Sequence, residues 1–122
     1  LLATSDVVSL HCPYSPDTHH LISTPQLQAM KRSAFLVNTA RGPVVDEAAL
    51  VAALEAGEIA GAGLDVFEKE PEVHAGLLDR DDVVLIPHLG SATVETRTAM
   101  ATLAARNALG VLAGTGPVTP IT

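Results

Sequence analysis

Four short apolar runs, separated by polar or helical segments, limit this sequence to one class of fold. The runs cover residues 7–10, 35–38, 59–66 and 83–86. Helical patterns lie between the first three runs and after the fourth, which predicts strands that alternate with helices. This alternation is typical of an α/β domain with a parallel sheet. The run at 83–86 is apolar throughout, which indicates a strand covered on both faces of the sheet.

Capping residues indicate where the helices begin and end. Thr24 is a suitable N-cap and Pro25 suits the first turn, so a helix is expected to continue to about residue 30 or 31. Asp46 is expected to cap the clearest helix, which contains apolar residues at helical spacing, and Gly57 suits its C-terminal end. A long helix is predicted over about 93–113.

Composition excludes several classes of partner. The net charge is −7, which argues against nucleic acid and against an anionic membrane. No apolar run approaches the ~20 residues that a membrane span needs. Cys12 is the single cysteine, so an internal disulfide and a cysteine-based zinc site are excluded, and a cytoplasmic setting is expected.

Arg41, Glu70 and His88 each follow one of the predicted strands. The ends of parallel strands face one crevice, where ligands bind, so these three side chains are expected to meet. A guanidinium matches a carboxylate through two hydrogen bonds. An imidazole that titrates near neutrality can supply and recover a proton, and a nearby carboxylate orients it. The set suits a small anionic carbonyl substrate.

Each of these residues, taken alone, has a plainer interpretation. A single arginine is often a solvated ion pair, and a histidine after a strand is often only hydrogen-bonded there. Glu68 is a second candidate for the acidic partner, and both glutamates could belong to a solvated loop. Asp65 could be a turn or cap residue. These alternatives are not separated by the residues alone.

Four segments, in this order, resemble the D-isomer-specific 2-hydroxyacid dehydrogenases. The segments are Ser9–Pro13, Val37–Gly42, Leu64–Pro71 and Pro87–Ser91. The resemblance covers nearly the whole chain, and four motifs in order are far more specific than any one of them. The family includes glyoxylate and hydroxypyruvate reductases and phosphoglycerate dehydrogenase.

The resemblance implies a fold and a division of the chain. Residues 1–92 are expected to form the second half of a Rossmann-like, parallel-sheet dinucleotide-binding domain. Residues 93–114 are expected to be a long C-terminal helix that crosses back to the substrate domain, and 115–122 a tail. The N-terminal half of the parent protein, with its glycine-rich loop, is expected to be absent, and the full-length parent to be a homodimer.

The resemblance also implies roles for particular residues. Arg41 would bind the substrate α-carboxylate, His88 would be the acid–base, and Glu70 would pair with His88. Asp65 would hydrogen-bond the nicotinamide carboxamide. The residues expected to contact NAD or NADP are Cys12, Thr39, Asp65, His88, Gly90 and Ser91.

No metal site is predicted. His19 and His20 are adjacent, so their side chains are expected to diverge, and no acidic partners stand at ligand spacing in the sequence. Asp46 and Glu47 are interpreted as a helix start with a favourable dipole interaction.

Three functions are therefore considered. The first is an NAD(P)-dependent oxidoreductase that passes a hydride between nicotinamide and a small D-2-hydroxy or 2-oxo acid, such as glyoxylate, hydroxypyruvate or 3-phosphoglycerate. The second is a dinucleotide-sensing protein like the family's corepressors. The third is an inactive fragment, which would be poorly stable or would self-associate through an uncovered strand edge.

Overall fold

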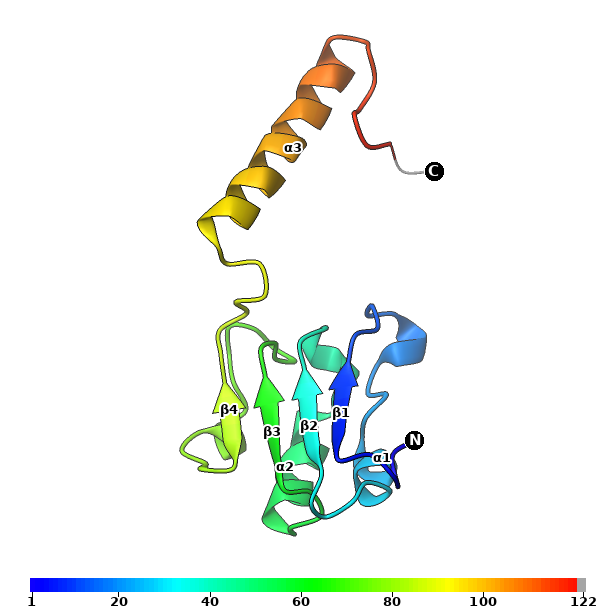
Figure 1. Cartoon of the computed structure of the whole chain (residues 1–122), viewed down its shortest axis with the longest axis vertical. Helices are drawn as coiled ribbons and strands as arrows, with labels where there is room; N and C mark the ends of the chain where they lie inside the picture. The colour runs from blue at the N-terminus through cyan, green and yellow to red at the C-terminus, as the bar shows by residue number, and fades with distance from the viewer. Residues whose placement is uncertain (121–122) are drawn as a thin grey trace. The chain divides into compact units, whose positions relative to one another are not determined.

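A four-stranded parallel sheet forms the centre of residues 1–89 in the computed structural model, which describes residues 1–120 (Figure 1). The strands are paired in chain order and run in one direction. They are β1 (Val7–Leu10), β2 (Phe35–Asn38), β3 (Gly61–Leu64) and β4 (Val83–Leu85). The α/β parallel-sheet prediction is therefore confirmed.

Residues 1–120 also contain three α-helices. They are α1 (Thr24–Gln28), α2 (Glu47–Glu55) and α3 (Val94–Leu112). Short 3₁₀ turns occupy Pro16–Thr18, Gly42–Val44 and Ala75–Leu77. The chain divides into two units, Leu1–Leu89 with the sheet and Gly90–Thr122 with α3.

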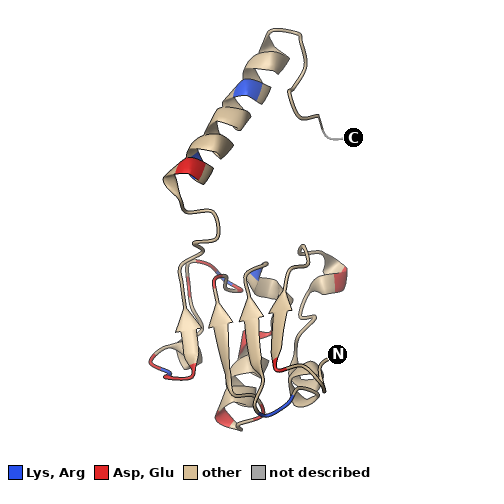
Figure 2. Cartoon of the chain, in the orientation of Figure 1, with Lys and Arg blue, Asp and Glu red and all other residues tan. Residues whose placement is uncertain are grey.

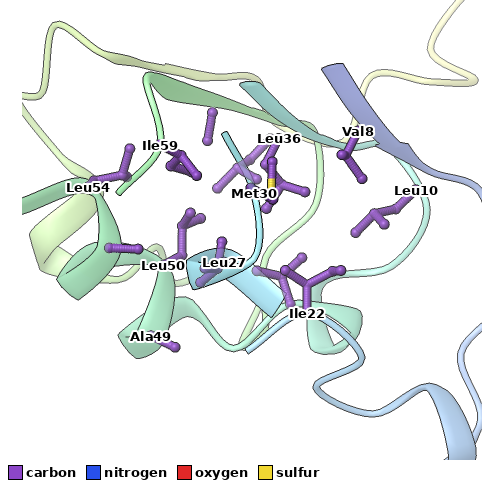
Figure 3. Close-up of a cluster of buried hydrophobic side chains, with 14 of the residues drawn as sticks. Val8, Leu10, Ile22, Leu27, Met30, Leu36, Ala49, Leu50, Leu54 and Ile59 are labelled. Atoms are coloured by element: carbon purple, nitrogen blue, oxygen red, sulfur yellow. The ribbon is translucent and has the colours of Figure 1, made fainter. Parts of the chain in front are cut away.

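The hydrophobic core lies between one face of the sheet and the helices α1 and α2. Alternate residues of β1 and β2 point into it, as the period of a strand requires. Leu27 of α1, Leu36 of β2 and Leu50 of α2 are fully buried, and Figure 3 shows these side chains directed toward one another. The four strands carry no charged residue; charged residues lie in loops and helices (Figure 2).

The opposite face of the sheet differs from the prediction. The strand at 83–86 was expected to be covered on both faces, but Val84 is 66% exposed and Ile86 lies outside β4. Val7 and Phe35 are also exposed. The reason is that α1 and α2 cover only one face, so an apolar strand sequence does not by itself bring a second layer of helices.

Two predicted elements are shorter than expected. The strand predicted over 59–66 is β3, Gly61–Leu64, because its residues pair with β2 over Gly61–Leu64 and with β4 over 62–64. The helix α1 ends at Gln28, before the expected residue 30 or 31.

The caps of α1 and α2 explain where these helices begin. The N-cap of α1 is Ser23, and the prediction of Thr24 was wrong by one residue, because the Gln26 side chain accepts the Ser23 N–H at 3.2 Å. Asp46 caps α2 as predicted, and its Oδ1 accepts the Ala49 N–H at 3.0 Å. Gly57 follows α2 with φ of 63°, which fits the predicted C-terminal signal.

The long helix α3 confirms the prediction of 93–113 to within one residue at each end. Thr93 caps it by accepting the Thr96 N–H at 3.2 Å, and Gly114 follows with φ of 72°. Among the helices that the structure describes, none is long and apolar enough to cross a bilayer. The last two residues of the predicted tail at 115–122 lie outside the described part of the chain.

Candidate active site

The four strands end in one row, which places the candidate residues at one edge of the sheet. Leu10 is opposite Asn38, Asn38 is opposite Leu64, and Leu64 is opposite Leu85. The loops that follow these residues therefore leave the sheet at its carboxyl edge, where parallel α/β sheets bind ligands. These loops carry Cys12, Thr39, Arg41, Asp65, Glu70 and His88.

Glu70 and His88 form a hydrogen-bonded pair of candidate side chains. His88 Nδ1 lies 2.9 Å from Glu70 Oε2. The other carboxylate oxygen, Oε1, accepts the N–H of Phe67 at 3.0 Å. The hydrogen bond from His88 lowers the pKa of Glu70 below its ordinary 4.5, and this effect outweighs the opposing effect of burial. Glu70 is therefore a carboxylate at neutral pH and can orient the imidazole.

Asp65 secures the loop that carries His88. Its side chain is buried, and Oδ1 accepts the N–H of Leu89 at 2.5 Å. His88 itself has φ of 53°, a left-handed conformation that is uncommon for residues other than glycine. A buried carboxylate that binds the next amide helps to hold this turn. Gly90 and Ser91 follow in the second unit.

Arg41 lines a different cavity from Glu70 and His88. It borders a hollow of about 810 Å³, with Cys12 and Thr39 among the other lining residues. Glu70 and His88 line one of about 190 Å³. Arg41 is exposed, and its Nη1 donates to the Ala40 carbonyl at 2.6 Å. The structure thus pairs two of the three predicted residues and places the third on the same sheet edge.

The turn before Arg41 is shaped by Asn38, the last residue of β2. The Asn38 side chain is buried, accepts the N–H of Ala40 at 3.0 Å and donates to the Arg41 carbonyl at 3.0 Å. An asparagine at a strand end can close a turn in this way because its amide both donates and accepts. The local sequence Asn-Thr-Ala-Arg thus fixes how Arg41 leaves the sheet.

Sequence reasoning missed a hydrogen-bonded group around Glu68. Glu68 Oε1 lies 2.7 Å from His20 Nε2, and Oε2 accepts the N–H of Glu47 at 3.0 Å. The Glu47 carboxylate in turn accepts the N–H of Glu68 at 2.9 Å, and Glu47 is buried. Glu68 was considered only as a rival of Glu70, because its partners stand 21 and 48 residues away and no local pattern indicates them.

The expectation that His19 and His20 diverge was wrong. Their rings stack, with centroids 4.0 Å apart, and His20 has a left-handed backbone with φ of 51°. Acidic groups absent from the nearby sequence also reach His20 through the fold: Asp46 and Glu68 join it within 4.8 Å. The oxygens of both carboxylates already contact protein groups, so we interpret this trio as a hydrogen-bond network.

Comparison with known proteins connects this geometry to a family. Residues 1–90 match the family model of the D-isomer specific 2-hydroxyacid dehydrogenase, NAD binding domain. The chain belongs to this family. It is 56% identical over 118 residues to a glyoxylate reductase of Thermofilum pendens, covering 96% of this chain and 35% of that protein. It is 53% identical over 116 residues to glyoxylate/hydroxypyruvate reductase B of Serratia proteamaculans, covering 94% and 36%.

Solved structures show the same fold in this family. An NADPH-dependent glyoxylate/hydroxypyruvate reductase of Sinorhizobium meliloti, in complex with NADP and malonate, has a TM-score of 0.91 and 42% identity over 96% of this chain and 37% of that one. An NAD-complexed D-isomer specific 2-hydroxyacid dehydrogenase of Lactobacillus delbrueckii has a TM-score of 0.87 and 35% identity, covering 99% and 41%. This member of the family spans about a third of the length of its curated relatives.

Proposed function

We propose that this chain carries the acid–base part of an NAD(P)-dependent D-2-hydroxyacid dehydrogenase that acts on glyoxylate or hydroxypyruvate. The observation that carries the proposal is the 2.9 Å contact between His88 Nδ1 and Glu70 Oε2 at the carboxyl edge of the sheet. The family match and the names of the relatives support the class of substrate.

The chemistry assigns a role to each nitrogen of His88. Reduction of a 2-oxo acid adds a hydride to the carbonyl carbon and a proton to its oxygen, and the reverse reaction removes both. Nδ1 is occupied by Glu70, so Nε2 is the nitrogen left to give the proton and take it back. The Glu70 carboxylate holds the His88 ring in one orientation.

Arg41 is the proposed anchor for the substrate carboxylate. Arg41 is exposed at the sheet edge, and its guanidinium donates one short hydrogen bond to the Ala40 carbonyl. The remaining N–H groups can bind a carboxylate through two parallel hydrogen bonds. Because Arg41 and the Glu70–His88 pair line separate cavities here, the proposal requires the substrate to lie between the two groups.

The residues present fit part of a nicotinamide dinucleotide. The hollow of about 810 Å³ has the size of a small-molecule site and lies after β1 and β2. The bound cofactor would supply or accept the hydride. The proposed contacts to NAD or NADP are Cys12, Thr39, Asp65, His88, Gly90 and Ser91. We also propose a cytoplasmic homodimer in which residues 1–92 belong to the cofactor domain and 93–114 return to the substrate domain.

The test measures turnover after the intact mass of the purified protein has been determined. NADH and NADPH oxidation would be followed with glyoxylate and with hydroxypyruvate. The variant His88→Ala is expected to lose about 10²–10⁴-fold in kcat, the usual contribution of general acid–base catalysis. His74→Ala is the matched control, because His74 lines a different cavity and caps a 3₁₀ turn.

Two outcomes would count against the proposal. Measurable turnover that is equal in wild type and His88→Ala would remove His88 from the chemistry. If a protein as long as the curated relatives bound the dinucleotide tightly but showed no turnover, the dinucleotide-sensing function would be favoured instead.

A further inference from the structure

The loop that carries Glu70 is fastened to α2 through Glu68. The Glu68 N–H donates to the Glu47 carboxylate at 2.9 Å, and the Glu47 N–H donates to the Glu68 carboxylate at 3.0 Å. These two bonds are reciprocal, and Glu47 is buried. The first turn of α2 therefore fixes both the backbone and the side chain of Glu68, two residues before Glu70.

His20 provides the second attachment of the same loop. The His20 Nε2 lies 2.7 Å from Glu68 Oε1, and the backbone N–H of His20 donates to the Pro43 carbonyl at 2.9 Å. His20 thus bridges the loop after β3 and the segment that follows Arg41. Its Nδ1 faces Asp46 Oδ2 at 3.8 Å, so the imidazole lies between two carboxylates.

The remainder of the loop depends on this attachment. Phe67 precedes Glu68, and its N–H donates to Glu70 Oε1. The peptide between Phe67 and Glu68 also packs against Gly42, where an added Cβ would lie 1.8 Å from the Phe67 carbonyl oxygen. A displaced Glu68 would therefore move the donor that orients the Glu70 carboxylate.

We propose that Glu68 is a positioning residue for the Glu70–His88 pair, acting through its bonds to Glu47 and His20. The inference rests on the proposed function for its catalytic meaning, but the geometry it concerns can be measured without turnover. Loss of the Glu68 side chain should release the loop, lengthen the contact between Glu70 and His88, and leave the sheet intact.

Loss of the Glu68 charge and displacement of the loop predict opposite changes in the pKa of Glu70, so a measurement can separate them. Removing a nearby negative charge makes a carboxylate easier to form and lowers the pKa of Glu70. Loss of the hydrogen bond from His88, the main cause of the lowered pKa, raises it toward 4.5. The groups that face Glu70 are His88, Asp65 and the N–H of Phe67.

The experiment is an NMR titration of the Glu70 carboxyl carbon in this chain, with the Phe67 amide as a second reporter. Glu68→Ala removes both acceptor oxygens. Glu68→Gln keeps an oxygen for the Glu47 N–H and presents an amide donor to His20, so it should rescue part of the effect. Glu72→Gln is the control, because it removes one negative charge from the same loop and the Glu72 side chain is exposed.

His20→Asn is the second variant, in case Glu68→Ala does not fold. Asparagine tolerates the left-handed backbone of His20 but is too short to replace the bond to Glu68. In Glu68→Ala and in His20→Asn we expect the pKa of Glu70 to rise toward 4.5 while the core amide resonances are retained. In Glu72→Gln we expect the pKa of Glu70 to fall or stay unchanged.

The positioning role alone would be overturned if the pKa of Glu70 fell or stayed unchanged in folded Glu68→Ala. If Glu68→Ala does not fold, the same result in His20→Asn would overturn it. If Glu70 titrates at its ordinary 4.5 in the wild type, the Glu70–His88 pair itself is overturned, and the acid–base part of the proposed function fails with it.

Discussion

The substitution Gly42→Ala probes the contact that joins the Arg41 loop to the Glu70 loop. An added Cβ on Gly42 would lie 1.8 Å from the Phe67 carbonyl oxygen and 2.5 Å from the Glu68 nitrogen. These neighbours are backbone atoms, which cannot rotate away as a flexible side chain can. Gly42 is not among the residues with positive φ, so the penalty is steric and not conformational.

The size of the effect follows from the displacement needed. Real Cβ contacts stay beyond 3.0 Å, so the two loops must separate by about 1 Å. Overpacking of this kind costs about 1–3 kcal/mol, and rigid backbone neighbours favour the upper end. Alanine returns about 0.4–1 kcal/mol by restricting the unfolded chain. We expect a net loss of about 2 kcal/mol, or roughly 8–16 °C in Tm for a unit of this size.

The assay is urea unfolding followed by far-ultraviolet circular dichroism, with Gly63→Ala as the matched control. A Cβ on Gly63 meets only Val37 Cγ2, at 4.0 Å, so this variant should be neutral or more stable by about 0.5 kcal/mol. Hydrogen exchange should also be faster at the Glu68 amide in Gly42→Ala. If the two glycine variants unfold within about 0.5 kcal/mol of each other, the reasoning is refuted.

Three further predictions concern the core, the acid response and the open face of the sheet. Leu50→Ala should cost about 2–5 kcal/mol, because Leu50 is fully buried between α2 and the sheet; a loss below 1 kcal/mol in urea unfolding would contradict this. Burial raises the pKa of Asp46, but hydrogen bonds from the Ala49 N–H and the Ser23 hydroxyl, with the nearby His20, bring it below 3.8. The stabilisation that Asp46 gives to the folded state is therefore complete above pH 3.8 and is lost as the pH falls through the lower pKa of Asp46 in the folded state. Asp46→Ala should cost about 1 kcal/mol of unfolding free energy at pH 7 and should weaken the dependence of that free energy on pH in acid. Val84 is 66% exposed on the open sheet face, so Val84→Lys should reduce concentration-dependent self-association in sedimentation velocity, and a wild type that stays monomeric at high concentration would contradict this.

Local signals in the sequence were sufficient for much of the fold. The β1 and β2 runs were predicted with their observed bounds, because β-branched and aliphatic residues stop at a proline or a polar turn in each case. Asp46 and Gly57 marked the ends of α2 because capping depends on backbone groups within a few residues. The parallel sheet followed from the alternation of these elements.

The candidate site was predictable only as a list of residues on strand ends. The order of the motifs indicated Arg41, Glu70 and His88, and the structure brings Glu70 to His88. It could not indicate that Arg41 lines another cavity, because that depends on how Asn38 turns the chain after β2.

Contacts between distant segments needed the tertiary structure. The Glu47–Glu68 reciprocal hydrogen bonds span 21 residues and the His20–Glu68 hydrogen bond spans 48, and neither corresponds to a periodic pattern or a composition bias in the sequence. The exposure of Val84 was also not predictable, because the sequence of a strand does not indicate whether a helix covers it. The sequence by itself determined the α/β elements, their caps and the family motifs, because these are set by neighbouring residues. Only the tertiary structure decided how Glu68 and Gly42 hold the loop that carries Glu70, because that depends on which atoms the fold brings within hydrogen-bond or van der Waals distance.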